Sequence, residues 1–225
     1  MAQWLSEVAV SDVTLKPRIC AHAGCEGLPM DGLDAIEAGI QAGADFVELD
    51  LRFTRDGLAV LGHDPVVSRA PAGLTTLDLL ARHPGVVVNI DVKELSALVR
   101  HPTRLTKGSV PNPTYYTGLK SHQLATFRRG CPGAAHTVDN LPWWFGFGST
   151  EARVAHLKRL KGAGVLALNL SYLLVDERLM DASRRAGLPV RVWTVDDKQN
   201  MARMAALGVE VITTNRVTEL RKVLA

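Results

Sequence analysis

Several features that would assign this chain to a functional class are scarce in its sequence. The 225 residues carry 26 Lys and Arg against 23 Asp and Glu, a net charge of +3, with no long basic run. Because nucleic-acid-binding proteins usually concentrate positive charge on one face, no nucleic acid is expected as a partner. No apolar run approaches the ~18 residues of a membrane span, so we expect no transmembrane segment. The first residues lack a basic segment followed by an apolar stretch, so no signal peptide is expected either.

Cysteine is also scarce, and its spacing matches no ligand pattern. Cys20, Cys25 and Cys131 form no CxxC pair and no zinc-ligand spacing. An odd number of cysteines indicates reduced thiols rather than a disulfide framework, which favours a cytoplasmic protein. With 47% hydrophobic residues, the chain is long enough to bury one sizeable core, so a single domain over residues 1–225 is expected.

Short apolar runs alternate with stretches of helical periodicity along the chain. The expected strands cover residues 18–23, 45–53, 86–93, 114–119, 134–139, 165–170, 190–195 and 210–215. The expected helices cover residues 31–43, 75–83, 94–105, 122–129, 150–164, 176–187, 197–208 and 217–224. This alternation predicts an α/β fold with a parallel sheet covered by helices, and the count of eight predicts a closed (β/α)₈ TIM barrel. An extra short strand at 59–64 is expected to pair with the second strand through a turn at 55–57.

Polar residues recur at every second position of the second expected strand. Residues i and i+2 of a strand point to the same face, so Glu48, Asp50 and Arg52 share one face. On the third expected strand, Asp91 and Lys93 share a face in the same way. In a barrel these faces point inward near the C-terminal ends of neighbouring strands, where barrel active sites lie.

These strands bring three carboxylates to one place. Glu48, Asp50 and Asp91 would repel one another unless a cation lay between them. Because oxygen ligands favour a hard ion, the sequence predicts a divalent metal site for Mg²⁺ or Ca²⁺. A structural explanation stays open, since paired carboxylates are common on solvated sheet faces and Lys93 can simply neutralise Asp91.

Two histidines lie near the ends of the first two expected strands. His22 ends the first expected strand, and His63 follows the second. A pair of histidines is suited to general acid and base catalysis near neutral pH, so both are candidate catalytic residues. His63 and Asp64 could instead form a turn in which the Asp caps the backbone.

A series of short motifs runs along the chain. The segments are His22-Ala23-Gly24, Gly43-Ala44-Asp45, Glu48-Leu49-Asp50, Thr54-Arg55-Asp56-Gly57, His63-Asp64, Asp91-Val92-Lys93, Trp193-Thr194-Val195-Asp196 and Gly208-Val209-Glu210 with Thr214-Asn215. In order and spacing they resemble the glycerophosphodiester phosphodiesterase family. The resemblance covers residues 18–93 and 164–224, whereas 94–150 matches poorly and looks shortened.

The resemblance implies a (β/α)₈ barrel that hydrolyses glycerophosphodiesters to glycerol 3-phosphate and an alcohol, assisted by a divalent metal. It implies two catalytic histidines and three metal ligands, which are His22, His63, Glu48, Asp50 and Asp91. It further implies that Lys93 lies beside the substrate phosphate and that Trp193 lines the substrate cleft.

Four positions depart from the family pattern. They are Ala23 in place of Arg, Met30 in place of Glu, Asp91 in place of Glu and Asn215 in place of Asp. A one-residue shift would place Asp31 at the position of Met30. Because Ala23 cannot supply the planar phosphate contact of an Arg, the inward-facing Arg52 is the candidate that compensates as a substrate-binding residue.

The departures leave two alternatives to hydrolysis open. One is a catalytically degenerate barrel that binds a phosphodiester without cleaving it. The other is a related lyase, in which a neighbouring hydroxyl of the substrate attacks phosphorus and forms a cyclic phosphate.

Overall fold

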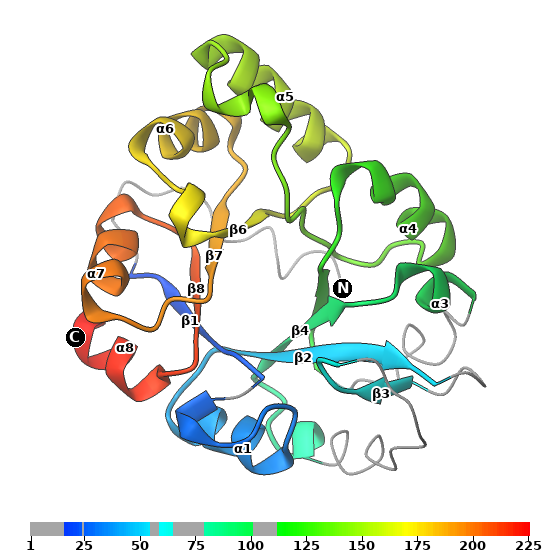
Figure 1. Ribbon diagram of the computed structural model, residues 1–225, viewed down its shortest axis with the longest axis vertical. Coiled ribbons are helices and arrows are strands. Elements are labelled where there is room, and N and C mark those ends of the chain that lie inside the picture. The colour runs from blue at the N-terminus through cyan, green and yellow to red at the C-terminus, as the bar shows by residue number, and fades with distance from the viewer. Residues whose placement is uncertain (1–15, 24, 55–58, 65–78, 101–111) are drawn as a thin grey trace.

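A ring of parallel strands lies at the centre of the molecule, with helices around it (Figure 1). The computed structural model describes residues 16–23, 25–54, 59–64, 79–100 and 112–225. Neighbouring strands pair in the order β5-β4-β2-β1-β8-β7-β6, and each of these pairs is parallel. The strands are β1 Arg18–Ala21, β2 Phe46–Phe53, β4 Val87–Val92, β5 Thr114–Thr117, β6 Leu168–Ser171, β7 Val190–Trp193 and β8 Val211–Thr214.

The ring is completed between β5 and β6 by the segment that was expected as a strand at 134–139. Tyr116 pairs with His136 and Val138 pairs with Leu168, both in parallel. The backbone N–H of Val138 donates to the carbonyl of Ala167 at 3.1 Å, which fastens the segment to the chain just before β6. The expected α/β barrel is therefore confirmed, although the expected strand at 134–139 is present as two isolated bridges.

The helices outside the ring match the expected ones to within a few residues. They are α1 Leu33–Gln41, α3 Leu95–Arg100, α4 Leu124–Gly130, α5 Thr150–Gly162, α6 Glu177–Ala186, α7 Lys198–Leu207 and α8 Val217–Leu224. Asp176 and Asp197 begin α6 and α7 as side-chain caps, as short acidic side chains do at helix N-termini. Residues 79–81 of the expected helix 75–83 are helical, whereas 75–78 and 101–105 lie outside the described residues. Within the described part of the chain, every helix is too short or too polar to cross a lipid bilayer.

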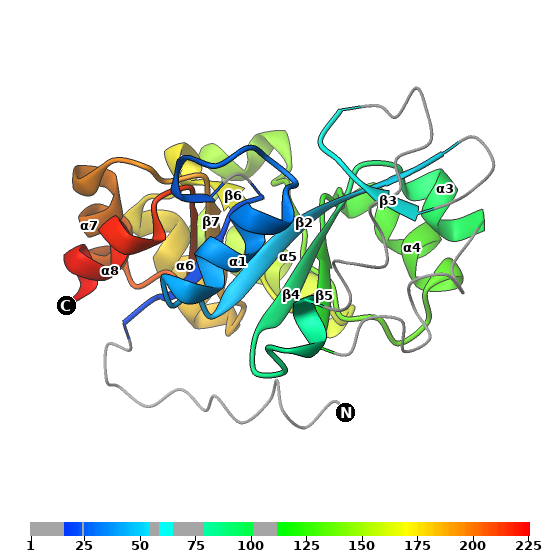
Figure 2. The same ribbon diagram turned by 90° about the horizontal axis from the view of Figure 1, so that it is seen from below.

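The extra strand is also present. β3, Ala59–Leu61, runs antiparallel to β2, with Arg52 opposite Val60 (Figure 2). The turn expected at 55–57 lies outside the described residues. The hairpin places Gly62 and His63 beside the C-terminal end of β2, where the N–H of Gly62 donates to the carbonyl of Asp50 at 3.0 Å.

Side chains of the strands alternate between two environments. Those facing outward, such as Leu49 and Ile90, are buried between the ring and the helices. At the N-terminal end of the ring, Phe46 and Tyr115 pack edge to face, and the guanidinium of Arg191 lies 4.4 Å from the centre of the Tyr115 ring. Because this end is filled, the inward side chains at the C-terminal end are the ones that can meet a substrate.

Candidate active site

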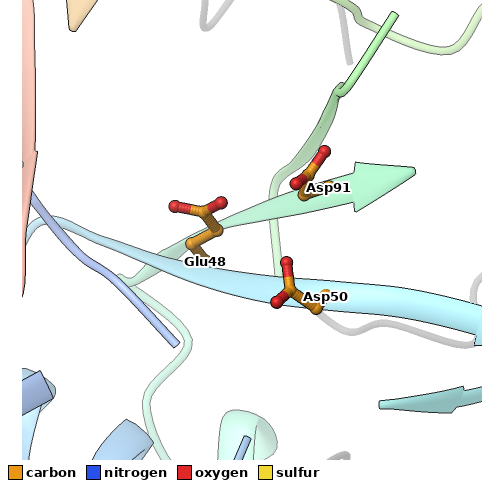
Figure 3. A group of neighbouring side chains, drawn as sticks. All are labelled: Glu48, Asp50 and Asp91. Atoms are coloured by element: carbon orange, nitrogen blue, oxygen red, sulfur yellow. The ribbon is translucent and has the colours of Figure 1, made fainter. Parts of the chain in front are cut away.

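Three carboxylates converge at the C-terminal end of the ring. Glu48 and Asp50 project from β2 and Asp91 projects from β4 (Figure 3). The parallel register places Asp50 opposite Asp91, so strand pairing itself aligns the two side chains. One oxygen atom from each of the three residues lies within 4.8 Å of the others. The structure thus brings together the three residues that the sequence predicted as metal ligands.

Within the carboxylate cluster of Glu48, Asp50 and Asp91, the first two residues are buried and Asp91 is partly exposed. Burial raises the pKa of Glu48 well above its ordinary value, and the charges of Asp91 and Asp50 raise it further. Asp50 is 1% exposed. Its two oxygens accept no hydrogen bond from the described residues, although Lys93 Nζ lies 2.9 Å from Oδ1. Buried carboxylate oxygens without donors are costly unless a cation compensates them.

Lys93 provides positive charge beside the cluster. Its Nζ lies 2.5 Å from Oδ2 of Asp91 in addition to its contact with Asp50. Burial lowers the pKa of Lys93, but its interactions with Asp91 and Asp50 outweigh burial and raise that pKa. One lysine cannot balance three carboxylates. The oxygen-only donor set, together with the buried Oδ2 of Asp50 that accepts no hydrogen bond from the described residues, therefore fits a hard divalent cation.

His22 lies at the end of β1 and contacts the loop that follows β8. Its Nδ1 is 2.9 Å from Oδ1 of Asn215. The side-chain amide of Asn215 donates to Oδ2 of Asp196 at 2.7 Å. Because a carboxylate only accepts, the oxygen of Asn215 must face His22 and accept from Nδ1–H. A neutral His22 therefore carries its proton on Nδ1, which leaves Nε2 as the acceptor.

His63 lies after β3, and its backbone is held by two other segments. Its N–H donates to Oδ2 of Asp31 at 2.9 Å, and its carbonyl accepts from the guanidinium of Arg52. The imidazole is 57% exposed, with Nδ1 3.3 Å from Oδ1 of Asp64. The pKa of Asp31 is raised by burial, and it also responds to the charges of Asp50 and His63. Asp31 is therefore in direct contact with the backbone of His63 and within electrostatic range of Asp50.

Two further predicted residues have defined contacts. Arg52 uses Nε and Nη2 on the carbonyl of His63, at 2.9 and 2.6 Å, and Nη1 on Glu94 at 3.0 Å. Trp193 ends β7 opposite Ser171 and is 39% exposed. Its indole N–H donates to the carbonyl of Asn169 at 3.3 Å. Trp193 thus presents a partly exposed aromatic face at the end of the ring where the cluster lies.

One inward acidic residue was missed in the sequence. Asp139 accepts from the N–H of Gly118 at 3.0 Å, from the amide of Asn169 at 2.8 Å and from the hydroxyl of Thr137 at 3.1 Å. Burial raises its pKa to about 7, and the charge of Asp91 adds to that shift. The i, i+2 spacing of Thr137 and Asp139 was a signal that could have identified it, by the same rule that identified Glu48 and Asp50.

The fold and the carboxylate cluster define the class as an α/β-barrel enzyme with a candidate metal centre at the C-terminal end of its strands. The glycerophosphoryl diester phosphodiesterase family model matches residues 22–141 and 132–219. The chain belongs to the glycerophosphoryl diester phosphodiesterase family and is a phosphodiesterase by that membership.

Curated relatives carry the same family name. Glycerophosphodiester phosphodiesterase GDPD4 of Arabidopsis thaliana is 27% identical over 245 residues, covering 88% of this chain and 70% of that protein. Probable glycerophosphodiester phosphodiesterase 2 of Mycobacterium tuberculosis is 25% identical over 235 residues, covering 91% of this chain and 89% of the relative.

Solved structures share the fold. A putative glycerophosphoryl diester phosphodiesterase from Silicibacter pomeroyi superposes with a TM-score of 0.75 at 17% identity, covering 93% of each chain. An Oleispira antarctica phosphodiesterase, solved with the product sn-glycerol-3-phosphate, gives a TM-score of 0.75 at 16% identity, covering 92% of this chain and 96% of that one. At these identities the likeness establishes the barrel.

Proposed function

We propose that this chain is a metal-dependent enzyme that hydrolyses glycerophosphodiesters to glycerol 3-phosphate and an alcohol. The observation that carries the proposal is the cluster of Glu48, Asp50 and Asp91, in which Asp50 is 1% exposed and Lys93 is the one described residue that pairs with its carboxylate. Family membership supports the reaction class. The Oleispira antarctica phosphodiesterase solved with sn-glycerol-3-phosphate supports the choice of product.

The carboxylate cluster would hold Mg²⁺ or Ca²⁺. A divalent cation held there supplies positive charge for a non-bridging phosphate oxygen. Lys93, which contacts both Asp91 and Asp50, would add a second positive charge beside the phosphate. Because Glu48 and Asp50 are buried, these electrostatic interactions would be stronger than in bulk water.

His22 acts as the general base and His63 as the general acid. Nε2 of His22 accepts the proton of the attacking water, because Nδ1 already donates to Asn215. The water oxygen bonds to phosphorus, the bond from phosphorus to the alcohol oxygen breaks, and that oxygen takes a proton from His63. Trp193 would line the cleft from the end of β7, with its indole held by the Asn169 carbonyl.

A cytoplasmic location for this lipid and glycerol metabolism is part of the proposal. Cys20, Cys25 and Cys131 are all buried and unpaired. Free thiols support a reducing compartment, since oxidising compartments favour disulfides.

The test is the release of glycerol 3-phosphate from a panel of small glycerophosphodiesters, with added Mg²⁺ or Ca²⁺ and with a chelator. Phosphorus NMR on the same samples identifies the product. His22→Ala and His63→Ala are expected to abolish turnover in folded protein. His83→Ala, which precedes β4 at the other end of the ring, is the matched control.

Each outcome has a distinct meaning. Metal-dependent glycerol 3-phosphate supports the proposal. A cyclic phosphate that accumulates without glycerol 3-phosphate would assign the chain as a lyase. Metal binding together with substrate binding, but without any product, would assign a binding protein whose site has lost catalysis.

A further inference from the structure

We infer that Asp31 and Arg52 are positioning residues that fix the backbone of His63 and thereby aim its imidazole at the substrate. The inference rests on the proposed role of His63 as the proton donor. It goes beyond that role because it assigns functions to two side chains outside the carboxylate cluster and the histidine pair.

The two side chains hold the two polar groups of one residue. Oδ2 of Asp31 accepts the N–H of His63 at 2.9 Å. The carbonyl of His63 accepts Nε of Arg52 at 2.9 Å and Nη2 at 2.6 Å. We call these three hydrogen bonds the His63 clamp. Since the imidazole itself is 57% exposed and contacts Asp64 at 3.3 Å, its direction depends mainly on how firmly its backbone is held.

The contacts of Arg52 favour positioning over substrate binding. Nε and Nη2 are directed at the His63 carbonyl, and Nη1 pairs with Glu94 at 3.0 Å. The side chain is 15% exposed, and Glu94 neutralises its charge. A phosphate would have to compete with bonds that already involve all three nitrogen atoms of this planar group. Arg52 therefore acts on the substrate through His63.

Asp31 is held in an unusual conformation that serves this contact. Its φ is 61°, in the left-handed region that side chains other than Gly adopt at a cost. Its own N–H donates to the carbonyl of Ala23 at 2.8 Å, which ties it to the end of β1 beside His22. The clamp thus connects the loop after β1 with the loop after β3, so the segments that carry the two histidines are linked through Asp31.

The clamp can be tested apart from activity by hydrogen exchange of the His63 amide, followed by NMR. Asp31→Ala removes the acceptor, whereas Asp31→Asn keeps an oxygen that can accept the same N–H. We expect Asp31→Ala to speed that exchange by about tenfold or more. The His63 amide exchanges only when its hydrogen bond to Asp31 is broken, and the variant lacks that bond. Asp31→Asn should stay close to the parent protein. Arg185→Ala, which removes an exposed pair with Asp181 on α6, is the control.

The catalytic consequence is read from kcat and KM separately. Loss of orientation should lower kcat by about tenfold or more and leave KM within about threefold in Asp31→Ala and Arg52→Gln. Asp31→Asn should restore kcat. The kcat of Arg52→Lys should lie between those of Arg52→Gln and the parent, because one ammonium cannot hold both the His63 carbonyl and Glu94.

The results separate the clamp from the proposed function. An Arg52→Gln variant in which KM alone rises would overturn the inference and return Arg52 to the substrate. An unchanged kcat in Asp31→Ala despite faster amide exchange would also overturn it. Near-normal turnover of His63→Ala would instead remove His63 from the mechanism, and the positioning role with it. If Asp31→Ala does not fold, the kcat and KM of Arg52→Gln and Arg52→Lys test the inference on their own.

Discussion

Oδ1 of Asn215 lies 2.9 Å from Nδ1 of His22, at a position where the family pattern has Asp. The contact fixes the tautomer without placing a negative charge on the imidazole, since the charged partner, Asp196, binds Asn215 instead. His22 therefore has a neutral neighbour that orients it, and that neighbour is held in turn by the partly buried carboxylate of Asp196. This arrangement is suited to a base that must be unprotonated before it acts.

Removing Asn215 should thus impair turnover without disturbing the metal centre. We expect Asn215→Ala to lower kcat by about 10- to 100-fold, part of the gain that a positioned general base provides. The metal-dependent rise in melting temperature should persist, because the carboxylate cluster is untouched. Asn200→Ala on α7 is the control, since Asn200 also contacts an Asp but at an exposed helix end. Loss of metal binding in Asn215→Ala would show that the residue supports the fold of the site instead.

Strand periodicity was sufficient to predict the carboxylate cluster. Glu48 and Asp50 share a face by the i, i+2 rule, and the next parallel strand places Asp91 opposite Asp50. No long-range information is needed, because consecutive parallel strands of a barrel are neighbours. The same reasoning explains why the fold class and seven of the strands were predictable within a few residues.

The partners of the inward polar groups were not predictable in the same way. Arg52 was expected at the substrate because it shares a face with Asp50, but its guanidinium binds the backbone of His63 and Glu94. Strand periodicity predicts which face a side chain lies on, but it does not predict which groups a long side chain contacts. The contact of His63 with Asp31 joins residues 32 positions apart, which no local pattern encodes.

Glu48 should stabilise the protein only when a cation is bound. In a chelator, Glu48→Gln should melt at a higher temperature than the parent and have a free energy of unfolding larger by on the order of 1 kcal/mol, because it removes a buried carboxyl from beside two others. The difference should grow as pH rises, since the raised pKa of Glu48 makes its ionisation costly in the folded state. With Mg²⁺ or Ca²⁺ the order should reverse, because binding to the native state stabilises the parent. A less stable Glu48→Gln in chelator would contradict this account.

Gly118 keeps the loop after β5 clear of the metal ligands. Its φ is 78°, and a Cβ there would overlap Oδ1 of Asp91 and lie 2.8 Å from the carbonyl oxygen of Val92. Gly118→Ala should therefore weaken metal binding, measured by calorimetry, and lower stability by more than about 1 kcal/mol.

Gly133 offers the matched control for this substitution. Its φ is 77°, yet a Cβ there would meet nothing within 4 Å. Gly133→Ala should show the cost of the left-handed backbone alone, about 1 kcal/mol, with metal affinity unchanged. Equal losses of metal affinity in the two variants would remove the steric explanation for Gly118.

Asp139 should make the metal-free protein less stable as pH rises towards neutrality. Burial raises its pKa from 3.8 to about 7, so the folded state binds a proton that the unfolded state releases near pH 4. The stability that this proton contributes is fully present below about pH 4. It is lost at roughly 1 kcal/mol per pH unit as the pH rises from there through 7.

Comparison with Asp139→Asn isolates this group from the other raised carboxyls. The amide oxygen can still accept from Gly118 and Asn169, and the amide nitrogen can donate to the hydroxyl of Thr137, so the packing is retained. Urea unfolding in chelator between pH 4 and 8 should give a smaller pH slope for the variant than for the parent. Parallel curves would show that Asp139 is ionised throughout, with its three hydrogen-bond donors outweighing the effect of burial.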